Sequence, residues 1–258
     1  IEFAMCTVVL LRWPDSKWPV LIAANRDEMQ SRAWSPPGRH WPNRPDIIAG
    51  RDELAGGSWL GMNDHGVVAA ALNRTGSLGP AADTRSRGEL VLDALDYADA
   101  ADAAQALSEL DPRAYRTFNL VIADNRDAFW LCNRRGASAI VANEVPTGIS
   151  IFTSQDMNDP TAPRVASFAQ RFKAAPIPAP ETGDWDAWAS LMGTRLGSLE
   201  DAPDAALCIT SEHGFGTVSS SLVALPISEP GARAVWLFSA GQPDREPYEP
   251  VDLTSPMV

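Results

Sequence analysis

Apolar, β-branched runs alternate along the chain with Ala/Leu-rich stretches that have helical spacing. Short apolar runs bounded by Gly, Pro, Asn and Asp are typical of strands, whereas Ala/Leu/Glu-rich stretches favour helices. The predicted strands are residues 6–13, 19–27, 58–62, 67–73, 117–124, 128–133, 138–143, 148–154, 206–210, 217–226 and 234–241. The predicted helices are residues 86–98, 99–110, 162–175 and 184–196.

The order of these elements indicates the fold class. Neighbouring strands are spaced as hairpins, and the first two runs predict an antiparallel pair. In the hairpin around Asn-Asp-His-Gly, Gly66 supplies the turn. Pairs of helices follow groups of strands that are apolar on both faces. We therefore expect an α+β fold, a four-layer αββα sandwich of two mainly antiparallel sheets between helix layers.

No composition shift and no repeat divides the chain, so a single domain is expected over residues 5–258. Residues 1–4, Ile-Glu-Phe-Ala, are interpreted as a leader from an expression vector, because Glu2-Phe3 is what a common cloning site encodes. Met5 is then the natural start. Removal of Met5 would make Cys6 the first residue of the mature chain.

Composition and charge exclude several partners. The chain has 258 residues and a formal net charge of −12, which disfavours nucleic acid and anionic membrane surfaces, since both are bound through Lys and Arg. No apolar stretch approaches the roughly 18 residues of a membrane span, so no stable membrane insertion is expected. Three scattered cysteines predict neither a disulfide framework nor a zinc site. We expect a reduced, cytoplasmic protein without a metal.

The first hairpin is predicted to gather three reactive groups. If its strands pair, the thiol of Cys6 lies beside the carboxylate of Asp27 and the guanidinium of Arg26. An amino-terminal cysteine carries its own general base, because an α-amine and a thiol titrate in neighbouring pH ranges. Asp27 would orient that amine, and Arg26 would stabilise developing negative charge. The alternative is structural, with a small cysteine filling the core and an ion pair on a turn.

Two further features suggest ligand binding. The histidines form no H-x-x-H or H-x-x-x-H pair, so a multi-histidine metal site is not expected. Each histidine could ligate haem iron singly, and His213, which is flanked by glycine, is the first candidate. Trp59 belongs to a tryptophan-rich first quarter that could line an apolar pocket, although core packing is the other interpretation.

Six motifs occur in one order along the chain: MCTVVLL, NRDE, GGSWLGMNDHGVVAAALNR, SRGELV, FNL and GFGTVSSSLVALP. Together they closely resemble the NRDE proteins, the Transport and Golgi organisation 2 family, from Met5 to about Ser239. That family is similar in fold to the amino-terminal-nucleophile hydrolases. It most resembles their cysteine branch, which contains penicillin V acylases, bile salt hydrolases and acid ceramidase.

The resemblance implies roles for the residues around the first hairpin. Cys6 matches the nucleophile of the cysteine acylases, and Asp27 matches the carboxylate that holds its amine. Asn25 and Arg26 lie where those enzymes place an Arg-Asn pair, in altered order. The resemblance therefore implies a catalytic set around Cys6.

Two positions depart from the acylase pattern. Gln155 stands where the acylases have an asparagine of the oxyanion hole, and its amide can still donate. Val218 stands where most NRDE proteins have an arginine, in F-G-T-V-S in place of Y-G-T-R-S. Because loss of one oxyanion-hole donor costs about 10²–10³ in rate, these departures weigh against hydrolysis.

The matched motifs also supply candidate ligand-binding residues, namely Trp59, Asn73 and Asn119, to which we add His213. The resemblance implies a role in haem trafficking or in lipid and acyl-CoA homeostasis. We therefore expect a small hydrophobic, acyl or haem-like ligand, no required cofactor, and a monomer or homodimer.

Three hypotheses follow. The first is a protein that binds or traffics haem or a related hydrophobic ligand on a hydrolase scaffold. The second is a cysteine amidohydrolase that acts on a small amide or acylated substrate with Cys6 as nucleophile. The third is a structural or interaction protein whose cavity is vestigial.

Overall fold

The computed structural model describes residues 6–77, 83–195 and 205–254. The chain divides into two compact units. The first unit comprises Ile1–Ser31 and Pro146–Pro250, and the second comprises Arg32–Val145 and Val251–Val258. The proposed leader, residues 1–4, lies outside the described residues together with Met5. The single domain over residues 5–258 stays a prediction.

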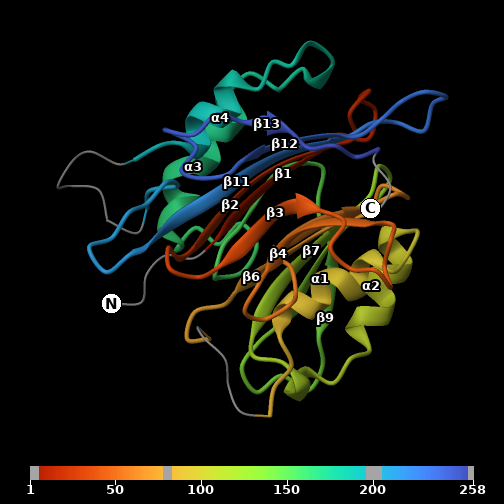
Figure 1. Cartoon of the computed structure of the whole chain (residues 1–258), viewed down its shortest axis with the longest axis vertical. Helices are drawn as coiled ribbons and strands as arrows, with labels where there is room; N and C mark the ends of the chain where they lie inside the picture. The colour runs from red at the N-terminus through yellow and green to blue at the C-terminus, as the bar shows by residue number, and fades with distance from the viewer. Residues whose placement is uncertain (1–5, 78–82, 196–204, 255–258) are drawn as a thin grey trace. The chain divides into compact units, whose positions relative to one another are not determined.

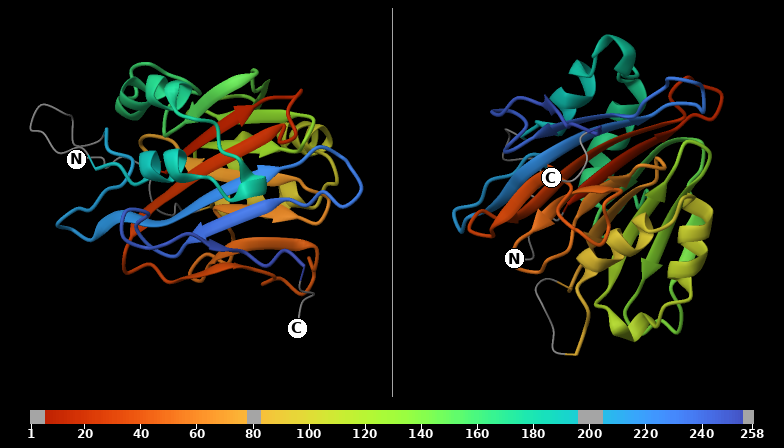
Figure 2. Two further views of the ribbon diagram at one scale, coloured as in Figure 1. Left: turned by 90° about the horizontal axis from the view of Figure 1, so that it is seen from above. Right: turned by 45° about the vertical axis from the view of Figure 1, so that its right-hand side comes forward.

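The first unit contains a six-stranded antiparallel sheet in the order β10-β1-β2-β11-β12-β13 (Figure 1). β1 and β2 (red) run beside β11 and β12 (blue), although these pairs come from opposite ends of the chain (Figure 2). The strands are β1 (Thr7–Arg12), β2 (Val20–Met29), β10 (Gly148–Phe152), β11 (Phe215–Leu225), β12 (Val235–Ser239) and β13 (Glu249–Pro250).

Two helices cover one face of this sheet, α3 (Pro163–Ala174) and α4 (Asp186–Met192), with the short 3₁₀ turn η2 (Pro180–Thr182) between them. Alternate residues of each central strand join their core, because successive side chains of a strand point to opposite faces. Phe168 and Phe172 of α3 and Trp188 of α4 pack there with no more than 2% exposure. We call the face of the sheet that packs against α3 and α4 the helix-covered face.

The second unit contains a seven-stranded antiparallel sheet in the order β3-β4-β5-β6-β7-β8-β9. Its strands are β3 (Trp34–Gly38), β4 (Ile47–Asp52), β5 (Leu60–Asn63), β6 (Val68–Asn73), β7 (Phe118–Ala123), β8 (Ala128–Asn133) and β9 (Val141–Glu144). Its helical elements are α1 (Arg87–Leu95), α2 (Ala100–Ser108) and the 3₁₀ turn η1 (Pro112–Ala114).

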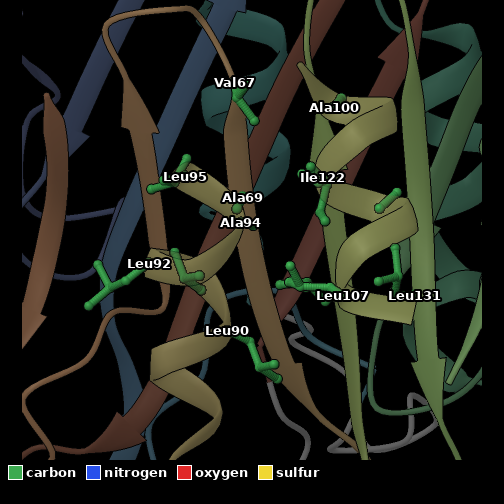
Figure 3. Close-up of a cluster of buried hydrophobic side chains, with 14 of the residues drawn as sticks. Val67, Ala69, Leu90, Leu92, Ala94, Leu95, Ala100, Leu107, Ile122 and Leu131 are labelled. Atoms are coloured by element: carbon green, nitrogen blue, oxygen red, sulfur yellow. The ribbon is translucent and has the colours of Figure 1, made fainter. Parts of the chain in front are cut away.

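The helices α1 and α2 pack on one face of the second sheet through a purely apolar cluster (Figure 3). Leu90 and Leu95 of α1 and Leu107 of α2 meet Ile122 of β7 in this cluster. Ser86 begins α1 with a capping box, since its side chain accepts from the first turn while Glu89 bonds back to it. Local capping and an apolar stripe therefore agree on where the helix lies.

The predicted fold class is confirmed, because both sheets are antiparallel and each carries a pair of helices. The hairpin of residues 6–13 and 19–27 forms, and Gly66 adopts a positive φ in the turn after β5. The predicted strand at residues 206–210 is wrong. Of these residues only Thr210 forms a β-bridge, to Gly216. The backbone N–H of Cys208 donates to Thr194 O, which belongs to no strand.

Three strands of the structure were not predicted from the sequence pattern, namely β3, β4 and β13. β3 contains Pro36 and Pro37, which remove backbone donors and hide a strand from a propensity argument. This is tolerated because β3 is at the edge of its sheet. Among the described residues, no helix combines the length and apolar character needed to cross a bilayer.

Candidate functional site

Cys6 lies at the head of β1, where the first hairpin opens. Thr7 is paired with Asn25, so the thiol comes next to the last residues of β2. The backbone N–H of Asp27 donates to Cys6 Sγ at 3.4 Å, and the sulfur lies 3.7 Å from Asp27 O. The structure therefore brings Cys6 and Asp27 together through the backbone of Asp27.

The carboxylate of Asp27 is used elsewhere, on the helix-covered face. Its Oδ2 accepts from Arg164 Nη2 at 2.7 Å, and its Oδ1 accepts from Thr217 Oγ1 at 2.7 Å. The side chains of Asp27 and Arg164 are 0% and 3% exposed. Burial raises the pKa of the Asp27 carboxyl, while Arg164 and Thr217 act in the opposite direction. Asp27 is thus the centre of a buried ion pair.

Arg164 is the residue that the sequence analysis missed. It also donates from Nη1 to Thr7 Oγ1 at 2.7 Å, so one guanidinium ties β1 to β2. Its sequence signal was weak but present. Arg164 occupies the same stripe of α3 as Phe168 and Phe172, at i+4 and i+8, where a surface arginine does not belong. A charge on a buried helix face indicates a buried partner.

The Cys6 thiol is held in its neutral form. Burial, and after it the negative charge of Asp27, raises the pKa of Cys6 from the ordinary 9.0 to about 11. The hydrogen bond from Asp27 N–H and the charge of Arg26 act in the opposite direction but do not prevail. A thiol in this state is a poor nucleophile near neutral pH, because the thiolate is the reactive form.

We expect Cys6 to react slowly with iodoacetamide at neutral pH. A pKa two units above 9.0 lowers the thiolate fraction about 100-fold, and the greater nucleophilicity of a more basic thiolate restores part of this. The net rate at pH 7.5 should be roughly tenfold below that of a thiol with the ordinary pKa. Mass spectrometry of the peptide that carries Cys6 measures this rate.

The pH profile provides the control for this measurement. The rate should keep rising with pH toward about 11, where the thiolate becomes the major form. Glutathione, treated in parallel, shows the behaviour of a solvent-exposed thiol. A Cys6 rate that reaches its plateau at or below pH 8 would show that the thiol is activated.

Asn25 and Arg26 point to opposite faces of β2, because successive strand residues alternate. Asn25 is buried, and its Nδ2 donates to Met192 O and to Leu207 O at 2.9 Å each. It therefore anchors β2 to the end of α4 and to the segment before β11. Arg26 is buried too, and its partner across the strands is Ser219.

Val218 is the extra residue of a β-bulge. Thr217 is paired with Asp27, and Ser219 is paired with Arg26, so Val218 has no residue opposite it. A bulge changes which face the following residues present. Here it sends Thr217 to the Asp27 face and Ser219 to the Arg26 face. The position that holds an arginine in the family pattern is thus the bulge itself.

Gln155 and His213 lie toward the same end of the first sheet. Phe152, the last residue of β10, is paired with Val8, so the chain that continues to Gln155 passes the head of β1. Gln155 is partly buried, and its backbone N–H bonds to Thr153 Oγ1. His213 is exposed in the turn before β11.

Two further candidates, Trp59 and Asn119, belong to the second unit. The Trp59 ring meets Trp34 edge-on, with centroids 5.8 Å apart. The ring also lies against Gly50, where an added Cβ would come within 2.3 Å of it. Both tryptophans are partly buried, so they form an aromatic pair with accessible surface.

Asn119 and Asn73 point to opposite faces of the second sheet. Asn119 is paired with Leu72, the neighbour of Asn73, so the two amides alternate. Asn119 Oδ1 accepts from Arg74 at 2.7 Å and from Trp130 at 3.0 Å. Asn73 is partly buried, and its side chain makes no hydrogen bond within the described part of the chain. The structure does not bring these two candidates together.

Metal ligands are scarce in the described ranges. Across residues 6–77, 83–195 and 205–254, no three His, Cys, Asp or Glu side chains gather as a metal ion would require. The arginines at 44 and 51 are engaged in ion pairs, with Asp93 and Asp96 in one case and Glu53 in the other.

Solved structures share this fold. The Caenorhabditis elegans ortholog of N-acylethanolamine-hydrolyzing acid amidase superposes with a TM-score of 0.55 at 13% identity, over 84% of this chain and 92% of that one. A conjugated bile acid hydrolase variant from Clostridium perfringens gives 0.50 at 12% identity, over 95% and 96%. At such low identity these likenesses show the fold alone, which is that of the amino-terminal-nucleophile hydrolases.

Sequence relatives are more specific. The human Transport and Golgi organization protein 2 homolog is 37% identical over 110 residues, which is 41% of this chain and 38% of the human protein. The mouse homolog is 34% identical over the same length. The aligned part thus spans well under half of these relatives. A family model described as Transport and Golgi organisation 2 matches residues 5–191, and the chain therefore belongs to that family.

Proposed function

We propose that this protein binds a hydrophobic ligand, with haem as the first candidate, and does not hydrolyse it. The observation that carries the proposal is the engagement of Asp27. In the catalytic interpretation this carboxylate orients the base of an amino-terminal cysteine. Here both of its oxygens bond to Arg164 and Thr217 at 2.7 Å.

The state of the thiol supports the same conclusion. The pKa of Cys6 is raised to about 11, so the thiol is protonated under physiological conditions. The family arginine is replaced by Val218, which is 8% exposed in the bulge and supplies no charge. The protonated thiol, the engaged carboxylate and the absence of a cation at position 218 therefore all disfavour turnover.

An aromatic surface in the second unit supports ligand binding independently. Trp34 and Trp59 pack edge to face, and Gly50 leaves room for the Trp59 ring. Large, partly accessible aromatic rings are the groups that bind flat apolar molecules such as porphyrins. Trafficking of haem, which the family resemblance implies, would use binding of this kind.

Titration with haemin tests the proposal. We expect a saturable shift of the Soret band at a stoichiometry of about one, because an apolar site has a defined capacity. Trp59→Ala should weaken binding roughly tenfold, as truncation of an aromatic anchor does. Trp13→Ala is the matched control, since Trp13 is 44% exposed and belongs to a different unit.

An unrelated acidic protein provides the reference for adsorption. Uptake of haemin that is non-saturable, or equal to that of the reference protein, would refute haem as the ligand. If Trp59→Ala left the affinity for haemin unchanged, the ligand would bind elsewhere than at the aromatic pair. If no hydrophobic ligand binds, the interaction hypothesis becomes the leading one.

One observation favours the amidohydrolase as a second candidate. The N–H of Asp27 donates to Cys6 Sγ at 3.4 Å, and this bond favours the thiolate. The hypothesis requires a protein prepared so that Cys6 is its first residue. Turnover of a panel of amides that disappears in Cys6→Ala would establish it. No Cys6-dependent turnover across that panel would rule it out.

A further inference from the structure

The segment before β11, residues 207–210, is largely buried although it belongs to no strand of the sheet. Leu207 and Cys208 are 0% and 1% exposed, and Thr210 forms an isolated bridge to Gly216. Buried backbone groups need hydrogen-bond partners, and side chains supply several of them here. We call residues 207–210 the linking segment, because their hydrogen bonds run in two directions.

In one direction the linking segment holds the surroundings of Asp27. Leu207 O accepts from Asn25 Nδ2 at 2.9 Å. The backbone N–H of Ile209 donates to Thr217 Oγ1 at 3.0 Å, and Ile209 O accepts from the backbone N–H of Thr217 at 3.0 Å. The same Thr217 hydroxyl donates to Asp27 Oδ1 at 2.7 Å. The position of Ile209 therefore fixes the hydroxyl that holds the Asp27 carboxylate.

In the other direction the linking segment is fastened to a clasp, which we define as Arg195, Gln242 and Asp244. Arg195 donates to both carboxylate oxygens of Asp244, at 2.6 and 2.9 Å. Cys208 Sγ donates to Asp244 Oδ1 at 3.2 Å. Arg195 Nη2 donates to Oε1 of Gln242, whose Nε2 donates to Thr210 Oγ1, both at 2.7 Å. The clasp therefore holds the linking segment through the side chains of Cys208 and Thr210.

The clasp lies in the first unit and contains an ion pair that solvent reaches from one side, since the side chains of Arg195 and Asp244 are 31% and 25% exposed. Hydrogen bonding to Arg195 holds the pKa of the Asp244 carboxyl at about 2, so the pair stays ionised at physiological pH. Burial, and after it the hydrogen bond to Asp244, raises the pKa of Cys208 to about 12. This thiol is therefore a hydrogen-bond donor and not a nucleophile.

We propose that the clasp is a positioning device for the Asp27 site. It fixes the linking segment, the segment fixes Thr217, and Thr217 holds the Asp27 carboxylate beside Arg164. The negative charge of Asp27 in turn disfavours the thiolate of Cys6. A change in the surface ion pair thus reaches the chemistry of the thiol. The inference concerns the arrangement of the site, and it holds whether or not a hydrophobic ligand binds.

The experiment starts from Asp244→Asn, which removes the charge and keeps the shape of the side chain. Hydrogen exchange is measured at the two backbone N–H groups that join Ile209 and Thr217. The pH profile of Cys6 alkylation by iodoacetamide is followed by mass spectrometry of the peptide that carries it. Asp244→Glu restores the charge. Glu181→Gln is the matched control, because Glu181 makes a side-chain hydrogen bond of 2.8 Å on the surface of the same unit.

We expect Asp244→Asn to speed exchange of both N–H groups about tenfold, because its amide must turn a donor toward Arg195 or Cys208 and the linking segment then opens more readily. The pKa of Cys6 should fall below about 11. A fall of about half a unit raises the alkylation rate at pH 7.5 roughly twofold. Asp244→Glu should recover most of both effects, and Glu181→Gln should cause neither.

Three results overturn the inference. If Asp244→Asn exchanges at the wild-type rates, the clasp does not fix the linking segment. If exchange is faster but the pH profile of Cys6 is unchanged, the clasp is a local structural feature that does not position Asp27. Faster exchange spread evenly over the first unit, with Asp244→Glu no better than Asp244→Asn, shows a general loss of stability in place of positioning.

Discussion

Asp27→Asn should lower the free energy of unfolding by about 3–5 kcal/mol, the range found when one partner of a buried ion pair is removed. The substitution leaves the guanidinium of Arg164 buried without its charge partner, at a side-chain exposure of 3%. Thr217 keeps an acceptor, because an amide oxygen can replace Oδ1. The loss therefore reports on the charge and little on the hydrogen bond. Urea denaturation measures it.

A double-mutant cycle provides the control. Arg164→Met alone should cost a similar amount, since it leaves the Asp27 carboxylate buried and unpaired. Asp27→Asn combined with Arg164→Met should cost clearly less than the sum, because neither charge remains. Additive losses would show that the two side chains are not coupled, which would contradict the 2.7 Å contact.

Asn63→Asp should destabilise the second unit by about 3 kcal/mol or more, because it places a charge against buried backbone carbonyls. Asn63 is 3% exposed and uses every hydrogen-bonding site of its amide. Its Nδ2 donates to Leu95 O and Tyr97 O at the end of α1, at 2.9 and 2.6 Å. Its Oδ1 accepts from the N–H groups of residues 65 and 67, at 3.1 and 2.9 Å.

The same change at Asn73 is the matched control. Asn73 lies in the same sheet and is partly buried, and its side chain makes no hydrogen bond within the described ranges. Asn73→Asp should therefore change the free energy of unfolding by about 0.5 kcal/mol or less. Hydrogen exchange of α1 and of the β5–β6 turn localises the effect. If Asn63→Asp and Asn73→Asp lowered the free energy of unfolding equally, the hydrogen bonds of Asn63 to α1 and to the β5–β6 turn would not be the cause of the loss.

Much of the fold could be predicted from the local pattern of apolar and polar residues. The β1–β2 hairpin follows from two apolar runs and a short turn, and the α1 boundary follows from Ser86 and Glu89. These features depend on residues close in sequence. The strand expected at residues 206–210 failed because its apolar character serves burial without pairing, and Leu207 and Cys208 are 0% and 1% exposed.

The candidate site was predictable only in part, because several of its contacts join residues that are far apart in the sequence. The approach of Cys6 to Asp27 follows from the hairpin. The partner of Asp27 does not, because Arg164 lies 137 residues away and reaches it only after α3 docks. Thr217 lies 190 residues away and meets Asp27 only through the pairing of β2 with β11. No motif predicts such contacts, although an arginine in the apolar stripe of α3 indicates that one exists.

The bulge at Val218 changes how β11 can vary. In a regular strand Thr217 and Ser219 would share one face, and the demands of that face would constrain both. The extra residue assigns them to two faces, so each position can change without disturbing the other. Substitutions at Val218 leave this division in place. Deletion of Val218 would keep it as well, because Thr217 and Ser219 would then be consecutive residues of a regular strand, opposite Asp27 and Arg26; only the bulge itself would be lost.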